Sequence, residues 1–468
     1  MQEENYGYQE EEISGILYRY ESMRRNNENL FFDVSEFETI IDYYLENNDV
    51  TFAFEAAESA TRQHPNSVSI QLKKAKVLID KGRAVEALKA VKFLEKIEPG
   101  NFEIFIIKGV ALGMLGDIQG TRKNFDYALS MDKSEEVNIL LNITSILQNL
   151  NHYELLIPYL ERLANLEPHF SSHLYDLGFA NEKLGHNGES IKYYNRYLEQ
   201  EPFSDSAWYN MGIIYNKQGN NGKALEAYEY ALAVNPENSF ALFNKGNLLS
   251  NLGRFREALE VYLEYLEFED ESSEALTYAA ECYDKLGKKD LAVKLYNEAI
   301  DLDPDFSEPW FGLGIIFLND NKFDDSICYF KRAVNLDMEN PEYWYFLGKS
   351  YYRMSDIKNS VKSFREALKL DPFYDIVWSN LGHIIISEKL YSRVTGVLER
   401  ALKVIGDIHG LRFLLASAYL FSGQNEKCTE HLSLALLSTD KEFYEFEELL
   451  PRNMLNDEQI EMITKKFK

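Results

Sequence analysis

Cysteine is scarce in this chain of 468 residues, which contains only Cys282, Cys328 and Cys428. Three cysteines cannot build a disulfide framework for a chain of this length, and none belongs to a C-x-x-C pair. The first residues, MQEENYGYQEEE, lack the basic and apolar regions of a secretory signal. No apolar run approaches the roughly 18 residues of a membrane span. We therefore expect a cytoplasmic protein without a membrane span.

Basic residues are also few in comparison with acidic residues. The chain has 49 Lys and Arg against 76 Asp and Glu, which gives a formal net charge of −27. Such a charge argues against nucleic acid as a partner and against docking on anionic lipid. Glycine (25 residues) and proline (11 residues) are not enriched, so long flexible linkers are not expected.

The motifs of common catalytic and cofactor sites are missing. The sequence has no P-loop, no G-x-G-x-x-G after a strand, no G-x-S-x-G and no H-E-x-x-H. Its eight histidines are scattered along the chain. The sequence therefore predicts a protein that is not an enzyme and that has no cofactor and no metal site.

What the sequence does contain is a repeat of 34 residues. The four tryptophans, Trp208, Trp310, Trp344 and Trp378, are separated by multiples of 34 residues. Repeats at this spacing predict a stack of identical structural units. With one extra residue, Glu136, twelve repeats cover 34–442: 34–67, 68–101, 102–135, 137–170, 171–204, 205–238, 239–272, 273–306, 307–340, 341–374, 375–408 and 409–442.

Two positions of the repeat carry restricted residue types that indicate its local structure. Position 8, counted from the first residue of each repeat, is Gly or Ala in ten repeats, which predicts that a neighbouring helix backbone approaches closely there. Position 15 is a residue that tolerates the left-handed conformation at a helix end. The residues at position 15 are Gly82, Gly116, Gly185, Gly219, Gly253, Gly287, Gly423, Asn48, Asn151 and Asn321. Each unit is therefore predicted to be a helix, a turn and a second helix.

This pattern resembles the tetratricopeptide repeat family, whose signature is W-x₂-L-G-x₂-Y…A-x₃-F…A…P. The agreement is close in WYNMGIIY (208–215), followed by Ala224, Tyr228, Ala231 and Pro236, and in WFGLGIIF (310–317) and WYFLGKSY (344–351). The resemblance implies an all-α, right-handed superhelical solenoid of antiparallel helix pairs that binds proteins or peptides. On this register Cys282 and Cys428 occupy usually small positions, so we expect them to be packing thiols.

The segments outside the repeats are short. Residues 1–33 are acidic, and three interpretations stay open: a cap on the first repeat, a partly disordered tail, or a helix that docks on a partner or in the groove of this chain. Residues 443–468 are interpreted as a C-terminal capping helix, because the last repeat needs a polar outer face.

The resemblance implies a peptide-binding groove on the concave surface, lined by first-helix positions 2, 5, 6, 9 and 12. The candidate residues are Asn142, Tyr175, Asp176, Phe179, Tyr209, Asn210, Ile213, Phe243, Asn244, Asn247, Phe311, Tyr345, Lys349, His383 and Phe413. In one interpretation the Tyr and Asn residues only help the repeats to stack. In the other, the amides form a ladder that pairs with the backbone of a peptide, similar to that in the repeats of O-linked N-acetylglucosamine transferase.

Acidic residues outnumber lysines on the same face, which favours a neutral or basic protein segment as partner. These acidic residues are Glu38, Asp42, Glu103, Glu182, Glu274, Glu281, Asp284, Glu308 and Glu342. Two other functions stay open. The chain could be an accessory subunit of a translation, secretion or cell-envelope complex that binds through convex or terminal surfaces, or the regulatory partner of a separate transferase.

Overall fold

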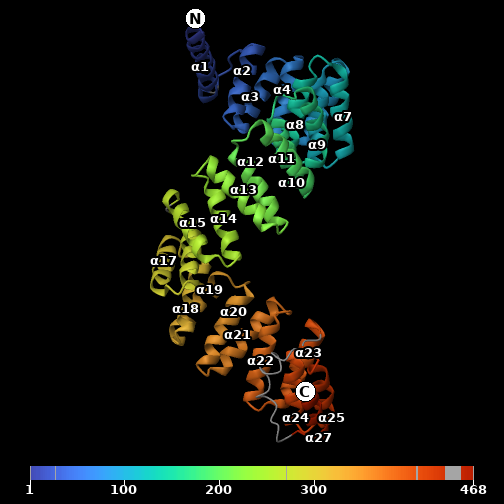
Figure 1. Cartoon of the computed structure of the whole chain (residues 1–468). Helices are drawn as coiled ribbons and strands as arrows, with labels where there is room; N and C mark the ends of the chain where they lie inside the picture. Colours follow the sequence, from blue (N-terminus) through green and yellow to red (C-terminus); the bar gives the residue numbers. More distant parts are fainter. Residues whose placement is uncertain (1, 27, 270, 407–408, 438–454, 467–468) are drawn as a thin grey trace. The chain divides into compact units, whose positions relative to one another are not determined.

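The computed structural model describes residues 2–26, 28–269, 271–406, 409–437 and 455–466 (Figure 1). These residues form 26 helices and no strand, so the predicted all-α class is confirmed for the described part of the chain. The chain divides into two compact units, Met1–Val234 and Asn235–Lys468. Within each unit, helices that follow one another along the chain pack as pairs, and the pairs stack (Figure 1).

The first unit contains thirteen of these helices. An N-terminal helix is followed by six helix pairs, whose members are 12 to 14 residues long. The helices are α1 (Gln2–Asn26), α2 (Val34–Glu46), α3 (Val50–Gln63), α4 (Val68–Asp80), α5 (Ala84–Ile97), α6 (Phe102–Met114), α7 (Ile118–Met131), α8 (Glu136–Asn149), α9 (Tyr153–Leu166), α10 (Ser172–Lys183), α11 (Asn187–Gln200), α12 (Asp205–Lys217) and α13 (Asn221–Val234).

The second unit continues the same alternation. Its helices are α14 (Ser239–Asn251), α15 (Phe255–Phe268), α16 (Ser273–Lys285), α17 (Lys289–Leu302), α18 (Ser307–Asn319), α19 (Phe323–Leu336), α20 (Pro341–Arg353), α21 (Ile357–Leu370), α22 (Asp375–Ser387), α23 (Tyr391–Ile405), α24 (His409–Phe421), α25 (Asn425–Ala435) and α27 (Asp457–Lys466). Residues 438–454, which include the end of the last predicted repeat and part of the predicted C-terminal cap, lie outside the described residues.

The turn between the two helices of each pair is left-handed at position 15. All ten glycines and asparagines predicted at this position have positive φ, between 56° for Asn151 and 81° for Gly116. Ser355 (63°) and Lys389 (59°) occupy position 15 of the two remaining repeats and adopt the same conformation. The prediction for this turn is therefore confirmed. The geometry of the repeat also imposes it on two residue types that rarely adopt it.

The small residue at position 8 makes room for an aromatic ring of the paired helix, and not for the backbone of a neighbouring helix. A Cβ atom added to Gly314 of α18 would lie 2.5 Å from Cε1 of Phe330, which projects from the paired helix α19. The expected close approach of a neighbouring backbone is corrected: the residue that needs the space is the side chain sixteen positions later. The same pairing joins Gly109 with Phe125, Gly178 with Tyr194, Gly212 with Tyr228, Gly246 with Tyr262 and Gly348 with Phe364, at 2.5 to 2.8 Å.

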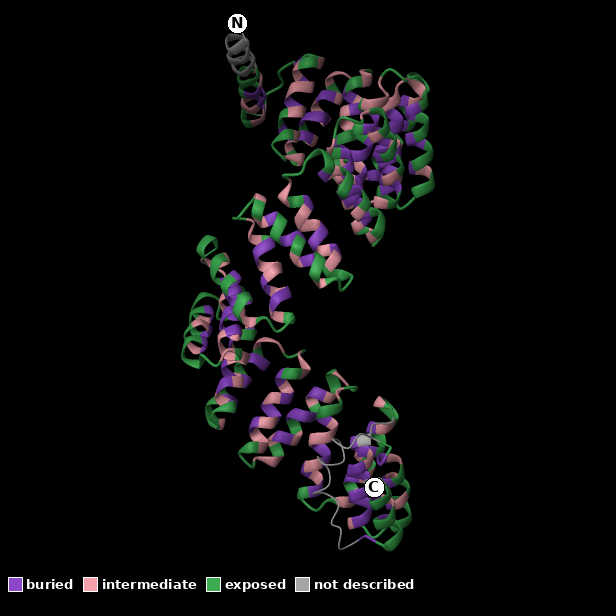
Figure 2. Cartoon of the chain, viewed as in Figure 1, coloured by how far each residue is buried: buried purple, intermediate pink, exposed green. Residues whose placement is uncertain are grey.

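These rings form the buried seam of each helix pair. Figure 2 shows buried residues on the helix faces that meet and exposed residues on the faces that point away. Phe330, Phe364, Tyr194, Tyr228 and Tyr262 are all among the largest fully buried side chains. Packing of this kind leaves little room for an added methyl group.

Two repeats that lack glycine at position 8 arrange the residue sixteen positions later differently. In the first repeat Ile41 occupies position 8, and the residue sixteen positions later is Ala57; both are fully buried in one cluster. In the repeat 273–306, Ala280 occupies position 8 and shares a buried cluster with Tyr296, whose ring also lies against Gly312 of α18, where an added Cβ would meet its ring and hydroxyl.

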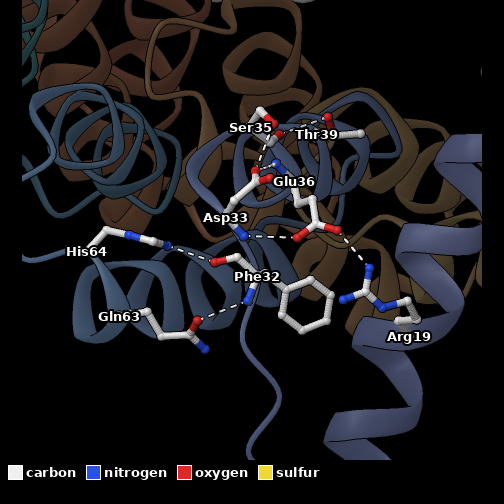
Figure 3. A network of polar contacts seen from close by, with 8 residues as sticks. All are labelled: Arg19, Phe32, Asp33, Ser35, Glu36, Thr39, Gln63 and His64. Carbon is white, nitrogen blue, oxygen red and sulfur yellow. Dashed lines mark hydrogen bonds and ion pairs between the residues drawn. The ribbon is translucent and has the colours of Figure 1, made fainter.

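The C-terminal part of α1 packs on the first helix pair. Tyr20 is 1% exposed and shares a cluster with Phe37 of α2 and Ala56 of α3. Figure 3 shows Arg19 of α1 pointing at Glu36 of α2, whose carboxylate it binds at 2.7 Å. These contacts favour the interpretation of residues 1–33 as a cap.

Hydrogen bonds between side chains and backbone groups hold the same region together. Asp33 and Glu36 form a reciprocal capping box at the start of α2, with bonds of 2.8 and 2.9 Å (Figure 3). Gln63 at the end of α3 accepts a hydrogen bond from the Phe32 amide at 3.1 Å, and the His64 ring lies 2.7 Å from the Phe32 carbonyl oxygen. The segment that joins α1 to α2 is thereby fixed against the end of α3.

Candidate functional site

The candidate groove residues lie on first helices of both units. In the first unit they lie on α8, α10 and α12, and α10 contacts α12. In the second unit they lie on α14, α18, α20, α22 and α24, and α16, α18 and α20 contact one another in sequence. We therefore consider the surface of first helices in each unit separately.

Asn210 of α12 is committed to packing between repeats. Its side-chain amide donates hydrogen bonds to the hydroxyl of Tyr175 at 3.0 Å and to that of Tyr194 at 3.1 Å. The rings of Tyr175 and Tyr194 pack edge to face, with centroids 5.5 Å apart. Burial raises the pKa of both phenols, so they stay neutral. Asn210 thus links α10, α11 and α12. This contact fits the interpretation in which the Tyr and Asn residues help the repeats to stack, rather than the amide ladder.

The other candidate asparagines, of which Asn142 and Asn244 belong to the proposed ladder, have different surroundings. The side-chain amide of Asn244 donates to the Phe240 carbonyl of its own helix at 2.9 Å. The Asn247 side chain accepts a hydrogen bond from the Tyr262 hydroxyl at 2.6 Å. Asn142 on α8 is exposed. These residues do not present one repeated arrangement of amides.

Asp176 of α10 is a partly buried carboxyl group. Its surroundings raise the pKa of the carboxyl group, chiefly through burial, against a smaller lowering by a hydrogen bond with Gln148 of α8 and by the charge of His173. An acid in such a place is stabilised by a proton or by a cation.

Several candidate aromatic residues pack on neighbouring rings and keep part of their surface exposed. Phe311 lies 4.7 Å from Tyr343 and 5.4 Å from Phe346, measured between ring centroids. Phe243 lies 5.8 Å from Tyr278 of the next first helix. The remaining half-buried candidates are Phe179, Tyr209 and Ile213.

Two aromatic candidates belong to the core, which corrects the expectation that they offer anchor area to a ligand. Tyr345 is only 5% exposed, because the rings of Phe346, Phe364 and Tyr374 surround it at centroid distances of 4.9 to 5.9 Å. Phe413 is completely buried in the C-terminal cluster.

The two basic candidates, Lys349 of α20 and His383 of α22, are half-buried. The ammonium group of Lys349 lies 5.4 Å from the centre of the Phe346 ring. Burial lowers the pKa of His383 below its usual value of 6.5, which favours the neutral imidazole.

The acidic residues of the first helices behave differently in the two units. In the first unit most of them are neutralised by a lysine on a neighbouring first helix: Asp42 pairs with Lys73, Glu103 with Lys76 at 2.9 Å, and Glu182 with Lys217 at 3.0 Å. The sequence analysis did not predict these pairs. A lysine and an acid in neighbouring repeats mark possible pairs, but the distance between the two helices decides which of them form.

In the second unit the acids of α16, α18 and α20 are not neutralised in this way. Within the described ranges, Glu274, Glu281, Asp284, Glu308 and Glu342 form no ion pair with a lysine or arginine. The pKa of Glu342 is raised, first by burial and then by the charge of Glu281 on α16. Glu308, Glu274 and Glu281 also raise the pKa of the half-buried Tyr278, after burial. A carboxylate on α18 therefore raises the pKa of a residue on α16, and a carboxylate on α16 raises the pKa of a residue on α20.

Residues with potential metal or thiol chemistry do not gather at this surface. Cys282 and Cys428 are buried and Cys328 is exposed, and burial raises the pKa of each of the two buried thiols to about 11. The prediction of packing thiols is confirmed. Across residues 2–466, leaving out the undescribed gaps, no group of three His, Cys, Asp or Glu side chains could hold a metal ion. The described helices include none that is long and apolar enough to cross a membrane.

Pairs of helices joined by a left-handed turn and repeated every 34 residues define an α-helical repeat protein. Models of the tetratricopeptide repeat family match residues 206–238, 243–305 together with 279–341, and 341–374. The matched residues are therefore tetratricopeptide repeats. No curated protein matches the sequence.

Solved structures of several proteins are similar to this chain. Yeast Tom70 has 13% identity, with 91% of this chain and 97% of that chain covered and a TM-score of 0.41. The Naa15/Naa10 complex bound to HypK-THB has 15% identity, with coverage of 85% and 67% and a TM-score of 0.38. YrrB, described as a TPR protein with an unusual peptide-binding site, has 17% identity, with coverage of 39% and 95% and a TM-score of 0.33. At such identities and scores we draw no functional conclusion from them.

Proposed function

We propose that this chain is a non-enzymatic scaffold that binds an extended, neutral or basic protein segment on its first helices. Tetratricopeptide repeat proteins bind protein or peptide partners, which supports the general role. The observation that carries the more specific proposal is the surface of α16, α18 and α20, where carboxylates without cationic partners lie beside half-buried rings. We call this surface the acidic face and define it by Glu274, Tyr278, Glu281, Glu308 and Glu342.

The chemistry of the acidic face favours a lysine or arginine side chain. Burial and the charge of Glu281 raise the pKa of Glu342, and the charge of a cation from a partner would act in the opposite direction by favouring the ionised carboxylate. The ring of Tyr278 offers flat apolar area next to these carboxylates, which suits the stem of a long basic side chain. A nucleic acid would meet like charge here, which is consistent with the net charge of −27.

The remaining candidate residues keep supporting roles in this proposal. Asn142, Asp176 and Phe179 would contact a segment bound to the first unit, and Phe243, Asn244, Phe311 and Lys349 one bound to the second. Asn210 and Asn247, which bind tyrosines, would hold the repeats in place.

The test uses the full chain and a fluorescein-labelled basic peptide of about twelve residues in which lysine alternates with apolar residues. Glu281→Gln/Glu308→Gln/Glu342→Gln should weaken binding about tenfold or more, because three carboxylates are removed from one face. The matched control is Glu260→Gln/Glu264→Gln/Glu267→Gln on the exposed side of α15, which removes the same charge. Equal weakening by both triple variants, or none by the first, would refute the proposed face.

Two other roles remain as proposals of lower rank. As an accessory subunit of a larger complex, the chain would be crosslinked along its second helices and termini rather than along its first helices. As the regulatory partner of a transferase, it would alter turnover by a separate catalytic chain. Cytoplasmic location remains an expectation from the scarcity of cysteine.

A further inference from the structure

A cavity of about 700 Å³ lies on the side of the second helices in the second unit. Residues of α21, α22 and α23, three consecutive helices labelled in Figure 1, line it, and we call α21 and α23 its walls. The apolar side chains that line it include Ile357, Val361 and Leu368 on α21, Trp378 and Ile385 on α22, and Val397 on α23. None of the candidate groove residues lines this cavity, which is therefore distinct from the acidic face.

The rim of the cavity is basic, although the chain as a whole is strongly acidic. Arg365 and Lys369 line it from α21, and Arg393 and Arg400 line it from α23, whereas Glu388 is the one acid among the lining residues. The two cations of α21 are one helical turn apart and those of α23 are two turns apart. Both walls therefore carry positive charge along their length rather than at a single point.

Three of these cations have no acid to neutralise them. In the described part of the chain, Arg365, Arg393 and Arg400 are exposed and form no ion pair. Lys369, by contrast, binds Glu366 of its own helix at 2.7 Å. The cavity thus faces solvent with one unneutralised guanidinium group on α21 and two on α23.

A glycine in the middle of α23 keeps the cavity open. A Cβ atom added at Gly396 would meet no atom within 4 Å, so neither packing nor a positive φ requires glycine there. Its carbonyl oxygen accepts a hydrogen bond from Nε of Arg400 at 3.0 Å. Glycine within a helix costs about 1 kcal/mol relative to alanine. The same position 22 carries long polar side chains in nine other repeats: Glu55, Lys89, Lys123, Lys192, Glu226, Glu260, Lys294, Lys362 and Glu430.

We propose that this cavity binds an acidic amphipathic helix of a partner protein. The apolar stripe of such a helix would fill the space between α21 and α23, and carboxylates on its two flanks would meet Arg365 and Arg393. The wall α21 has 14 residues and is therefore about 21 Å long, enough for roughly four turns of a bound helix. Charge on both walls selects an acidic occupant, in contrast to the basic segment proposed for the acidic face.

The test measures fluorescence anisotropy of a labelled synthetic helix of about 15 residues, with leucines at every third and fourth position and glutamates on both flanks. We expect the full chain to bind it with a Kd on the order of 10 µM. Arg365→Glu/Arg393→Glu should raise the Kd about tenfold or more. Gly396→Leu should do the same by filling the cavity, and leucine is a better helix former than glycine, so the fold is retained.

The matched control is Lys362→Glu/Lys403→Glu, which makes the same charge change on the exposed sides of the same two helices. It should leave the Kd within about twofold. The proposal is overturned if the synthetic helix does not bind, if a helix with lysine flanks binds equally well, or if the control weakens binding as much as the test pair. It is also overturned if sedimentation shows the chain self-associating through Arg365 and Arg393, since the occupant would then be a second copy.

Discussion

A substitution at Gly314 tests whether the buried ring of the paired helix requires glycine at position 8. It lies in the middle of α18, and a Cβ atom there would lie 2.5 Å from Cε1 and 2.6 Å from Cδ1 of Phe330. Carbon atoms prefer about 3.5 to 4.0 Å, so the Phe330 ring would have to move by about 1 Å. The ring is completely buried, which leaves it no open space to enter. We therefore predict that Gly314→Ala is destabilising.

The magnitude follows from two opposed effects. Replacing glycine by alanine within a helix stabilises by about 1 kcal/mol. Overpacking a well-filled core costs about 1–3 kcal/mol. Gly396→Ala has the first effect without the second, because no atom lies near its added Cβ. The two alanine variants should therefore differ by about 1–3 kcal/mol in their free energies of unfolding, with Gly396→Ala the more stable.

The assay is urea denaturation followed by tryptophan fluorescence, in which Trp310 and Trp344 report on α18 and α20. Phe330→Leu supplies the second arm of a double-mutant cycle, since leucine already faces glycine at Gly382 and Leu398. Alanine at 314 should cost less in the Phe330→Leu background than in the wild type. If Gly314→Ala proves as stable as Gly396→Ala, the ring does not determine the residue at position 8.

Two further predictions concern the first unit. Tyr194 and Tyr228 occupy the same repeat position, but the Tyr194 hydroxyl binds Asn210 at 3.1 Å, whereas the Tyr228 hydroxyl is buried with no hydrogen-bond partner in the described part of the chain. Tyr194→Phe should therefore destabilise by about 1 kcal/mol and Tyr228→Phe should be neutral or stabilising, and equal losses in thermal denaturation would contradict this. Burial raises the pKa of Asp176, so its carboxyl group binds a proton more tightly in the folded state than in the unfolded state. The stability gained from this protonation is present at low pH and is lost as the pH rises through the folded pKa. Asp176→Asn should thus increase the free energy of unfolding near pH 7 and increase it less near pH 4, and a gain that does not depend on pH would refute this cause.

The turn at position 15 could be predicted from the sequence because its cause is local. Glycine and asparagine mark ten of these turns, and all ten have positive φ. Ser355 and Lys389 could not be recognised by residue type, because there the rest of the repeat forces the conformation on an unfavourable residue. A residue-by-residue search therefore finds the turns that local chemistry favours and misses those imposed by packing.

Features that depend on two helices were harder to predict. The sequence indicated a small residue at position 8 but not that the space belongs to a ring, because the partner lies on another helix. Tyr345 occupies the same repeat position as the half-buried Tyr209, yet three neighbouring rings bury it. The pairing of Glu182 with Lys217 likewise depends on the distance between α10 and α12. Exposure and charge pairing at the candidate site thus required the structure.

The most direct test of the proposed function is to locate a bound basic segment on the full chain. A lysine-rich peptide that carries a benzophenone group is photo-crosslinked to the protein, and the attachment sites are mapped by mass spectrometry. We predict attachment within α16, α18 and α20, at residues of Ser273–Lys285, Ser307–Asn319 and Pro341–Arg353. Attachment confined to the second helices α17, α19 and α21 or to the termini would contradict the account.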